Sequence, residues 1–449
     1  MRKEKKQKVK KERHILRSFF QSLKNPRNLI VFVVIASICA VALFLFANRQ
    51  TDIDKVSMDY AEVFDNEVLK TNIETKFKNT YELSDYAIYG ENLILYESQY
   101  EAGEVDGLQG KSVVLRNVVT DSEIIFTISD GIDSGINLSR LDEGLYEVYI
   151  YDHYKKKRVF FNEEFESEKL YTIRRNDETK SVVMNTQKDF LSEIGVEMDE
   201  NYAFITVIDN TPIASVYDVV IDPSPNVVDI STNAVDYGYS SDTFNENDTS
   251  YQLAELLKEY LEKEGLRVLI TREKDETLSY YGSKGRAGIG YESGAKVYIA
   301  LGACEDDEIA HPYLITSPYS NSLLANEIAY CLKEEGIALE DVDDDEQLQE
   351  GVMWDERYQE YDANLGYMVY TPYEMQPQIR ETGGKLTKAG TMDGTTENQM
   401  YSQSYGMYGI YFTYCNVNNA DSVNYIVNND TLIARQLANG ICDYFDINT

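Results

Sequence analysis

Histidine, the side chain that most often acts as a general base, is scarce in this 449-residue chain. Three histidines are present, and two of them, His153 and His311, lie beyond the first 28 residues. Ser–His–Asp and Cys–His mechanisms use a histidine as the base, so this small number does not favour them. Two further candidates are Glu246, at the start of a predicted helix, and Cys304, at the end of a predicted strand. Carboxylate, thiolate and imidazole groups are typical zinc ligands.

The stretch 217–304 would have to position these candidates. Residues 219–221 are apolar at consecutive positions, as expected of a strand that is covered on both faces. Apolar residues recur at helical spacing across 248–264, and Gly265 stands where that helix would end. Further strands are predicted at 267–271, 296–301, 313–316 and 410–414, and further helices at 284–293, 320–335 and 430–445. This alternation predicts a mixed, largely parallel sheet flanked by helices.

The residues before this stretch show a different pattern. Across 83–215, short runs rich in Val, Ile, Tyr and Phe are separated by Gly, Asp, Asn and Ser turns. Such regular short runs predict an all-β, immunoglobulin-like sandwich. Residues 51–82 are polar with scattered apolar positions, and we interpret the segment before the sandwich as a stalk.

Charge is distributed very unevenly along the chain. Residues 1–28 hold eleven Lys and Arg against two Glu, so they carry +9, and the other residues carry −44 of the total of −35. A part of the chain that is so acidic is not expected to bind nucleic acid, because such binding depends on basic side chains that displace counterions from phosphates.

An uncharged run of nineteen residues, 29–47, follows the basic segment. Its length is sufficient for one helix across a bilayer core. A cleaved signal peptide is the alternative, but its apolar run would be shorter and would precede a better small-residue cleavage site. We therefore predict a single-pass protein of the cell membrane, with the basic N-terminus in the cytoplasm and the C-terminal domains outside it.

The predicted fold class thus combines an N-terminal transmembrane helix, a β-sandwich and an α/β domain. The predicted parts are a basic cytoplasmic tail (1–28), the transmembrane helix (29–47), the stalk (48–82), the all-β sandwich-like domain (83–215) and the α/β domain (216–449).

Several motifs in 216–447 resemble, in order and spacing, the zinc-dependent N-acetylmuramoyl-L-alanine amidases of the type 3 amidase family. The matching residues are Ile221-Asp222-Pro223, Gly265, Thr271-Arg272, Arg286, Gly294-Ala295, Gly383-Gly384-Lys385 and Ala389-Gly390-Thr391. The resemblance implies an amidase-like α/β domain with zinc as cofactor and peptidoglycan as substrate. It also implies a candidate binding groove at Asp222, Arg272, Arg286, Gly383 and Gly384.

The same resemblance shows that most functional positions of the family are substituted. Pro225 stands where the family has its first zinc-binding His, and Gly302 stands where it has its second. Thr413 takes the place of the catalytic Glu. Glu246 is the one metal-ligand position that is retained. We therefore predict a degenerate member of the family to which we assign no catalytic residue and no cofactor.

Two rebuilt metal sites remain open as alternatives. Glu246, Cys304 and His311 are potential zinc ligands if the fold brings them together. Asp341 and the acidic run 343–345 offer oxygen ligands of the kind that calcium prefers.

The sequence consequently favours an inactive, wall-facing amidase-like protein that binds peptidoglycan or a protein of the cell-wall remodelling machinery. One alternative is an active, divergent zinc amidase that cleaves the bond between N-acetylmuramic acid and L-alanine. A second alternative is a structural scaffold without affinity for glycan.

Overall fold

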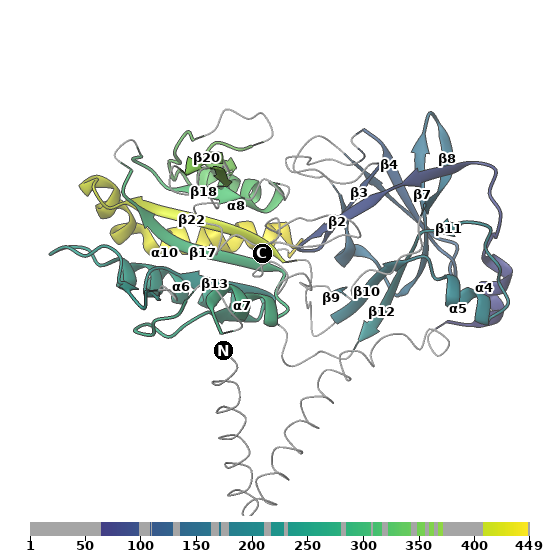
Figure 1. The fold of residues 1–449 in the computed structure, drawn as a ribbon, viewed down its shortest axis with the longest axis horizontal. Coiled ribbons are helices and arrows are strands. Elements are labelled where there is room, and N and C mark those ends of the chain that lie inside the picture. The colour runs from purple at the N-terminus through teal and green to yellow at the C-terminus, as the bar shows by residue number, and fades with distance from the viewer. Residues whose placement is uncertain are drawn as a thin grey trace, which may run out of the picture. The chain divides into compact units, whose positions relative to one another are not determined.

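The structure of the protein is a computed structural model, shown in Figure 1. It describes residues 64–97, 108, 110–128, 135–162, 170–171, 179–210, 217–228, 232–279, 284–306, 309–316, 322–342, 348–354, 359–362, 367–370 and 407–447. All of these residues belong to one compact unit that begins at Phe64.

The first part of this unit is built almost entirely from strands. A nine-stranded sheet has the order β1-β8-β7-β12-β10-β9. In addition, β4 pairs with β7 and with β5, and β11 pairs with β8. These strands are β1 (Thr80–Leu83), β4 (Ser112–Asn117), β5 (Glu123–Thr127), β7 (Gly144–Asp152), β8 (Lys155–Phe161), β9 (Leu170–Tyr171), β10 (Thr179–Asn185), β11 (Asn201–Tyr202) and β12 (Phe204–Asn210). A separate three-stranded sheet contains β2 (Asp85–Tyr89), β3 (Asn92–Tyr96) and β6 (Ile136–Asn137).

Short helical segments accompany these strands. They are α4 (Asn66–Asn72), the 3-10 turn η1 (Leu138–Arg140) and α5 (Lys188–Glu193). One core cluster contains the inward-facing residues of several strands, such as Val148 on β7 and Ile205 on β12. The predicted immunoglobulin-like topology and the predicted domain boundaries stay predictions.

The second part contains a six-stranded mixed sheet with the order β16-β13-β17-β22-β18-β19. Its strands are β13 (Val219–Pro223), β16 (Val268–Ile270), β17 (Val297–Cys304), β18 (Tyr313–Thr316), β19 (Val352–Trp354) and β22 (Tyr408–Asn416). The first four strands of the order run parallel, whereas β18 is antiparallel to β22. This architecture agrees in part with the predicted fold class. Two small hairpins, β14 (Val227–Val228) with β15 (Val235–Asp236) and β20 (Gln359–Asp362) with β21 (Tyr367–Tyr370), stand apart.

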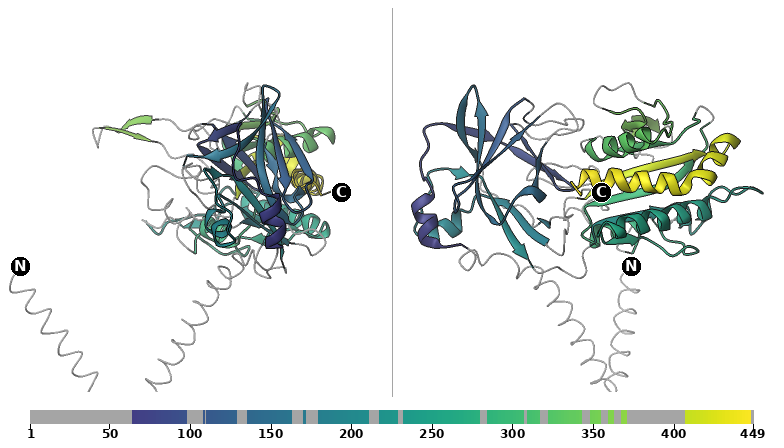
Figure 2. Two further views of the ribbon diagram at one scale, coloured as in Figure 1. Left: turned by 90° about the vertical axis from the view of Figure 1, so that its right-hand side faces the viewer. Right: turned by 180° about the vertical axis from the view of Figure 1, so that it is seen from behind.

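Helices cover both faces of this sheet because its central strands are apolar on both sides. The helices are α6 (Glu246–Lys263), α7 (Arg286–Glu292), α8 (Leu323–Glu334) and α10 (Ala420–Tyr444). Figure 2 shows α6, α10 and α8 side by side across one face, and their buried residues share a core cluster with Val219 and Ile299 of the sheet. Tyr298 and Ala300, the alternate residues of β17, belong to a second cluster.

The structure corrects the predicted transmembrane helix and the predicted location at the cell membrane. Within the described ranges, no helix is long and apolar enough to cross a membrane. The longest described helix, α10, carries Asp421, Asp430, Arg435 and Asp443, which are costly groups in a bilayer core. The segment 29–47 lies outside the described residues.

Candidate functional site

The positions that the amidase resemblance assigns to chemistry lie at one edge of the six-stranded sheet. Strands β13, β17 and β22 are parallel, so their carboxyl ends meet at the same edge. Gly302 on β17 pairs directly with Thr413 on β22. The loop after β13 is joined to β17 by a bond from the Ser224 backbone N–H to the Leu301 carbonyl, at 2.8 Å. The structure therefore brings this loop, Gly302 and Thr413 to one place.

Glu246 reaches the same edge from the start of α6. Asn245 caps this helix, because its side chain accepts a bond from the Asp248 backbone N–H at 3.0 Å. The Glu246 side chain accepts two further backbone bonds, from Tyr239 at 3.1 Å and from Ala303 at 3.3 Å. Only 4% of Glu246 is exposed. The retained carboxylate is thus fixed against the end of β17, one residue beyond Gly302.

Burial raises the pKa of Glu246 from its ordinary value of 4.5 to about 7. Desolvation is the main cause, and the charges of Asp236 and Glu305 act in the same direction. The backbone bonds from Tyr239 and Ala303 oppose it. A zinc-ligating carboxylate is ionised, whereas a pKa of about 7 leaves Glu246 about half protonated at neutral pH.

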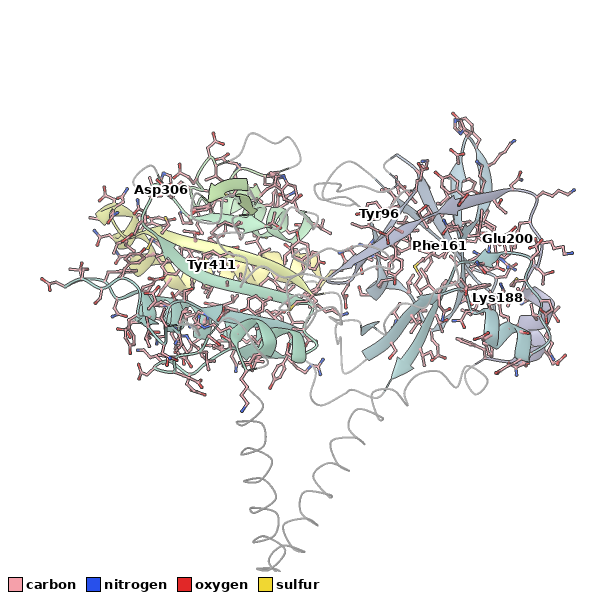
Figure 3. The ribbon with its side chains drawn as sticks, viewed as in Figure 1. Tyr96, Phe161, Lys188, Glu200, Asp306 and Tyr411 are labelled. Atoms are coloured by element: carbon pink, nitrogen blue, oxygen red, sulfur yellow. The ribbon has the colours of Figure 1, made fainter. Side chains whose placement is uncertain are left out.

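The position of Gly302 is already filled by an aromatic side chain. A Cβ atom on Gly302 would lie 1.8 Å from Tyr411 Oη and 3.4 Å from Ser224 Cβ. Tyr411 is buried and projects from β22 in the six-stranded sheet, where Figure 3 labels it. A histidine at 302 therefore has no space unless Tyr411 moves.

Pro225 and Thr413 complete the substituted set. A Cβ atom on Gly238 would lie 2.5 Å from Pro225 Cγ and 2.4 Å from Glu246 Oε2, so the proline ring and the carboxylate approach the same glycine. Thr413 is fully buried, and its hydroxyl has no hydrogen-bond partner among the described residues. Neither side chain can bind zinc as an imidazole does or act as a carboxylate base.

The described residues around Glu246 do not fit a zinc ion. No group of three or more His, Cys, Asp or Glu side chains that could hold a metal occurs in the part of the chain that the structure describes. Cys304 and His311, the two partners considered for a rebuilt site, do not form such a group with Glu246. Asp341 likewise belongs to no such group, and residues 343–345 lie outside the described residues.

A buried ion pair, Asp222 with Arg286, contacts the loop that follows β13. Asp222 accepts bonds from Thr271 Oγ1 at 2.6 Å and Tyr298 Oη at 2.7 Å, and it lies 3.4 Å from Arg286 Nη1. Arg286 also donates to the carbonyls of Pro223, at 3.1 Å, and Pro225. Asp222 and Arg286 are completely buried. Their observed role is to hold the loop that carries Pro225.

Arg272 holds the same loop from a second side. Its Nε donates to the Pro223 carbonyl at 3.0 Å, and its Nη2 donates to Asn247 Oδ1 at 2.7 Å. Because Arg272 is 3% exposed, it presents little surface to a ligand. The predicted groove role of Asp222, Arg272 and Arg286 stays a prediction, and Gly383 and Gly384 lie outside the described residues.

Tyr411 is the site residue that the sequence analysis missed. It stands two positions before Thr413, so both side chains point to the same face of β22. This alternation was readable from the sequence, but the proximity to Gly302 depends on the pairing of β17 with β22.

Solved structures similar to this chain are N-acetylmuramoyl-L-alanine amidases. The apo enzyme from Mycobacterium abscessus has 14% identity and a TM-score of 0.33, and the match covers 51% of this chain and 98% of that one. The catalytic domain of an amidase from Bacillus (Paenibacillus) polymyxa has 16% identity and a TM-score of 0.32, and the match covers 52% of this chain and 99% of that one. An amidase from Clostridioides difficile, in complex with a lipoprotein, has 13% identity and a TM-score of 0.32, and the match covers 52% of this chain and 100% of that one. No protein-family model and no curated protein matches the chain.

The raised pKa of Glu246 predicts a specific pH dependence of stability. Because the folded state holds this proton more tightly than the unfolded state, the free energy of unfolding should fall as the pH rises from about 4.5 to about 7. The contribution is about 3 kcal/mol. Glu246→Gln should remove this decline in urea denaturation at pH 5 to 8, whereas Glu255→Gln, on the exposed face of α6, should keep it. An unchanged decline in Glu246→Gln would contradict this interpretation.

The contact between Tyr411 and Gly302 predicts two substitutions that do not add. Gly302→Ala introduces a methyl group where Tyr411 Oη lies, so it should lower the free energy of unfolding by about 1–3 kcal/mol. In a Tyr411→Phe background, which lacks the hydroxyl, the same change should cost less. Urea denaturation of the wild type, the two single variants and the double variant measures this coupling. Equal costs in both backgrounds would show that the Tyr411 hydroxyl does not fill the space.

Proposed function

We propose that this chain is an amidase-like protein that binds peptidoglycan without hydrolysing it. The observation that carries the proposal is the state of Glu246, a carboxylate buried at the strand ends with backbone N–H groups as its bonding partners. Hydrolysis by zinc needs three protein ligands, an open position for water and a base. The described residues at this edge supply one of those groups.

The loop beside the substituted positions is nevertheless held by several buried side chains. The Asp222–Arg286 pair and Arg272 hold the 223–226 loop in a fixed conformation. Buried charges are costly, and a loop with no remaining role would not need them. A preserved loop beside a remodelled site favours recognition over catalysis. The amidase motifs in 216–447 support peptidoglycan as the ligand, and a role in regulating cell-wall remodelling would follow from that binding.

An active, divergent zinc amidase is the alternative, and the retention of Glu246 favours it. A scaffold without glycan affinity is the other alternative. The two alternatives and the proposal differ in whether peptidoglycan is cleaved and in whether it is bound.

One experiment with the full chain separates these functions. The protein is incubated with purified sacculi, with and without added zinc, and the sedimented fraction and the released stem peptides are measured. We expect co-sedimentation without peptide release, and the same result for Glu246→Gln, because Glu246 has no catalytic role in this proposal. Zinc-dependent release that Glu246→Gln abolishes would establish the active amidase. Protein that stays in the supernatant would establish the scaffold.

A further inference from the structure

The hairpin of β7 and β8 turns through two residues that are unfavourable at such a turn. Asp152 at the end of β7 pairs with Lys155 at the start of β8, so His153 and Tyr154 form the turn. Both have positive φ angles, 47° and 64°, as a type I′ turn requires. Asn and Gly are preferred at these two positions, because a bulky side chain strains the backbone there.

The two side chains add little to the packing of the folded chain. Tyr154 is fully exposed, and the His153 side chain is 91% exposed. His153 Nδ1 lies 2.8 Å from a carboxylate oxygen of Asp152, but ion pairs at the surface stabilise a fold only slightly. The chain thus keeps a strained turn whose side chains point into solvent. Backbone strain of this kind is concentrated where a protein contacts its ligands.

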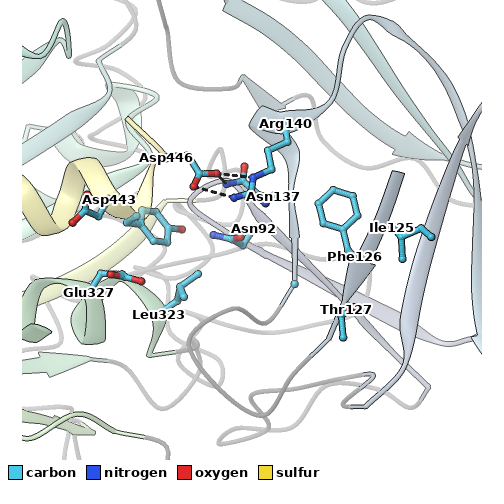
Figure 4. Close-up of a pocket in the computed structure, with 12 residues that line it drawn as sticks. Asn92, Ile125, Phe126, Thr127, Asn137, Arg140, Leu323, Glu327, Asp443 and Asp446 are labelled. Carbon is cyan, nitrogen blue, oxygen red and sulfur yellow. Dashed lines mark hydrogen bonds and ion pairs between the residues drawn. The ribbon is translucent and has the colours of Figure 1, made fainter. Parts of the chain in front are cut away.

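Two more exposed side chains lie next to this hairpin, on one face of its sheet. Figure 4 shows Ile125 and Phe126 on opposite sides of β5, and Phe126 belongs to the core cluster. Ile125 therefore lies on the outer face, where it is 59% exposed. Val114 pairs with both Ile125 and Tyr149, so Tyr149 and the alternate residue Tyr151 share that face. Tyr151 is 39% exposed. We call the following residues the outer patch: Ile125, Tyr151, His153, Tyr154 and Lys155.

The outer patch also carries positive charge, although the chain as a whole has a net charge of −35. The longest unbroken run of basic residues in the sequence is 155–158. Lys156 and Lys157 already form ion pairs with acidic side chains, and Arg158 is buried. Lys155 is exposed at the turn, and no acidic side chain among the described residues forms an ion pair with it. Its ammonium group is therefore free to pair with an anionic ligand.

A ligand that matches the outer patch has flat apolar faces, hydrogen-bonding groups and negative charge. The rings of Tyr151 and Tyr154 can stack on sugar rings, and their hydroxyl groups can form hydrogen bonds with them. Ile125 offers an aliphatic surface for the methyl group of an N-acetyl substituent. Lys155 favours a carboxylate, because charge-assisted hydrogen bonds are stronger than neutral ones. Peptidoglycan combines N-acetylated sugar rings with stem peptides that bear carboxylates.

We propose that the outer patch is a contact surface for peptidoglycan, in which Tyr151 and Tyr154 stack on sugar rings and Lys155 pairs with a stem-peptide carboxylate. The tight turn holds Tyr154 in a fixed direction, and this reduces the entropy lost on binding. The inference rests on the proposed function. It adds a place of contact in the β part of the chain, outside residues 216–447 that carry the amidase resemblance.

The first test replaces the turn by the residues that a type I′ turn prefers. His153→Asn combined with Tyr154→Gly should raise Tm by about 2 °C, because the strain is relieved. The same double variant of the full chain should bind purified sacculi about tenfold more weakly in co-sedimentation. Tyr330→Ser is the matched control, because Tyr330 is 51% exposed on α8 and lies outside the outer patch. It should bind as the wild type does.

The second test removes the charge. Lys155→Gln should weaken binding to sacculi by about fivefold, whereas Lys258→Gln on α6 should not change it. Wild-type protein that does not sediment with sacculi would refute the proposed function itself. If the wild type sediments, unchanged binding of the double variant or of Lys155→Gln would overturn this inference and leave the proposed function standing. A lowered Tm in the double variant would also overturn it, because the two side chains would then stabilise the fold.

Discussion

The ion pair between Asp222 and Arg286 is the constraint on which the candidate site depends. Both side chains are completely buried and lie 3.4 Å apart. Removing charges from water is costly, and attraction between the two charges repays that cost only when their remaining bonding groups are also satisfied. Asp222 accepts bonds from Thr271 and Tyr298, and the Nη2 group of Arg286 donates to carbonyls of the loop after β13. The pair therefore sets the path of this loop and the position of Pro225.

In the function that we propose, this chain keeps the sheet edge of the amidase resemblance without its zinc chemistry. The frame needs parallel strands that end at one edge, and β13, β17 and β22 provide them. The chemistry needs ionised ligands around an open space. Tyr411 fills the space beside Gly302, and desolvation favours the protonated form of Glu246. We propose that a site with these properties holds a fixed shape and does not activate water.

Much of the α/β fold was predictable because its signals are local. The apolar run 219–221 and the helical spacing of 248–264 correspond to β13 and α6. The last helix was predicted to begin at 430, whereas α10 begins at Ala420. Its first turns were missed because they are rich in Asn and Asp, which have low helix propensity. Asn419 caps it there. The place of Glu246 at the start of α6 could be assigned by counting back from Gly265, whereas the contact of Tyr411 with Gly302 arises from strand register, which single residues do not encode. The predicted membrane span found no support in the described helices.

We propose that the edge of the sheet beside Glu246 holds no zinc, and direct measurement of zinc binding tests this best. The full chain is equilibrated with an excess of Zn²⁺, freed of unbound metal by gel filtration and analysed for zinc per chain, beside Glu246→Gln. We expect far less than one zinc per chain and no difference between the two proteins. One zinc per chain in the wild type, lost in Glu246→Gln, would contradict it, because Glu246 would then be a working metal ligand.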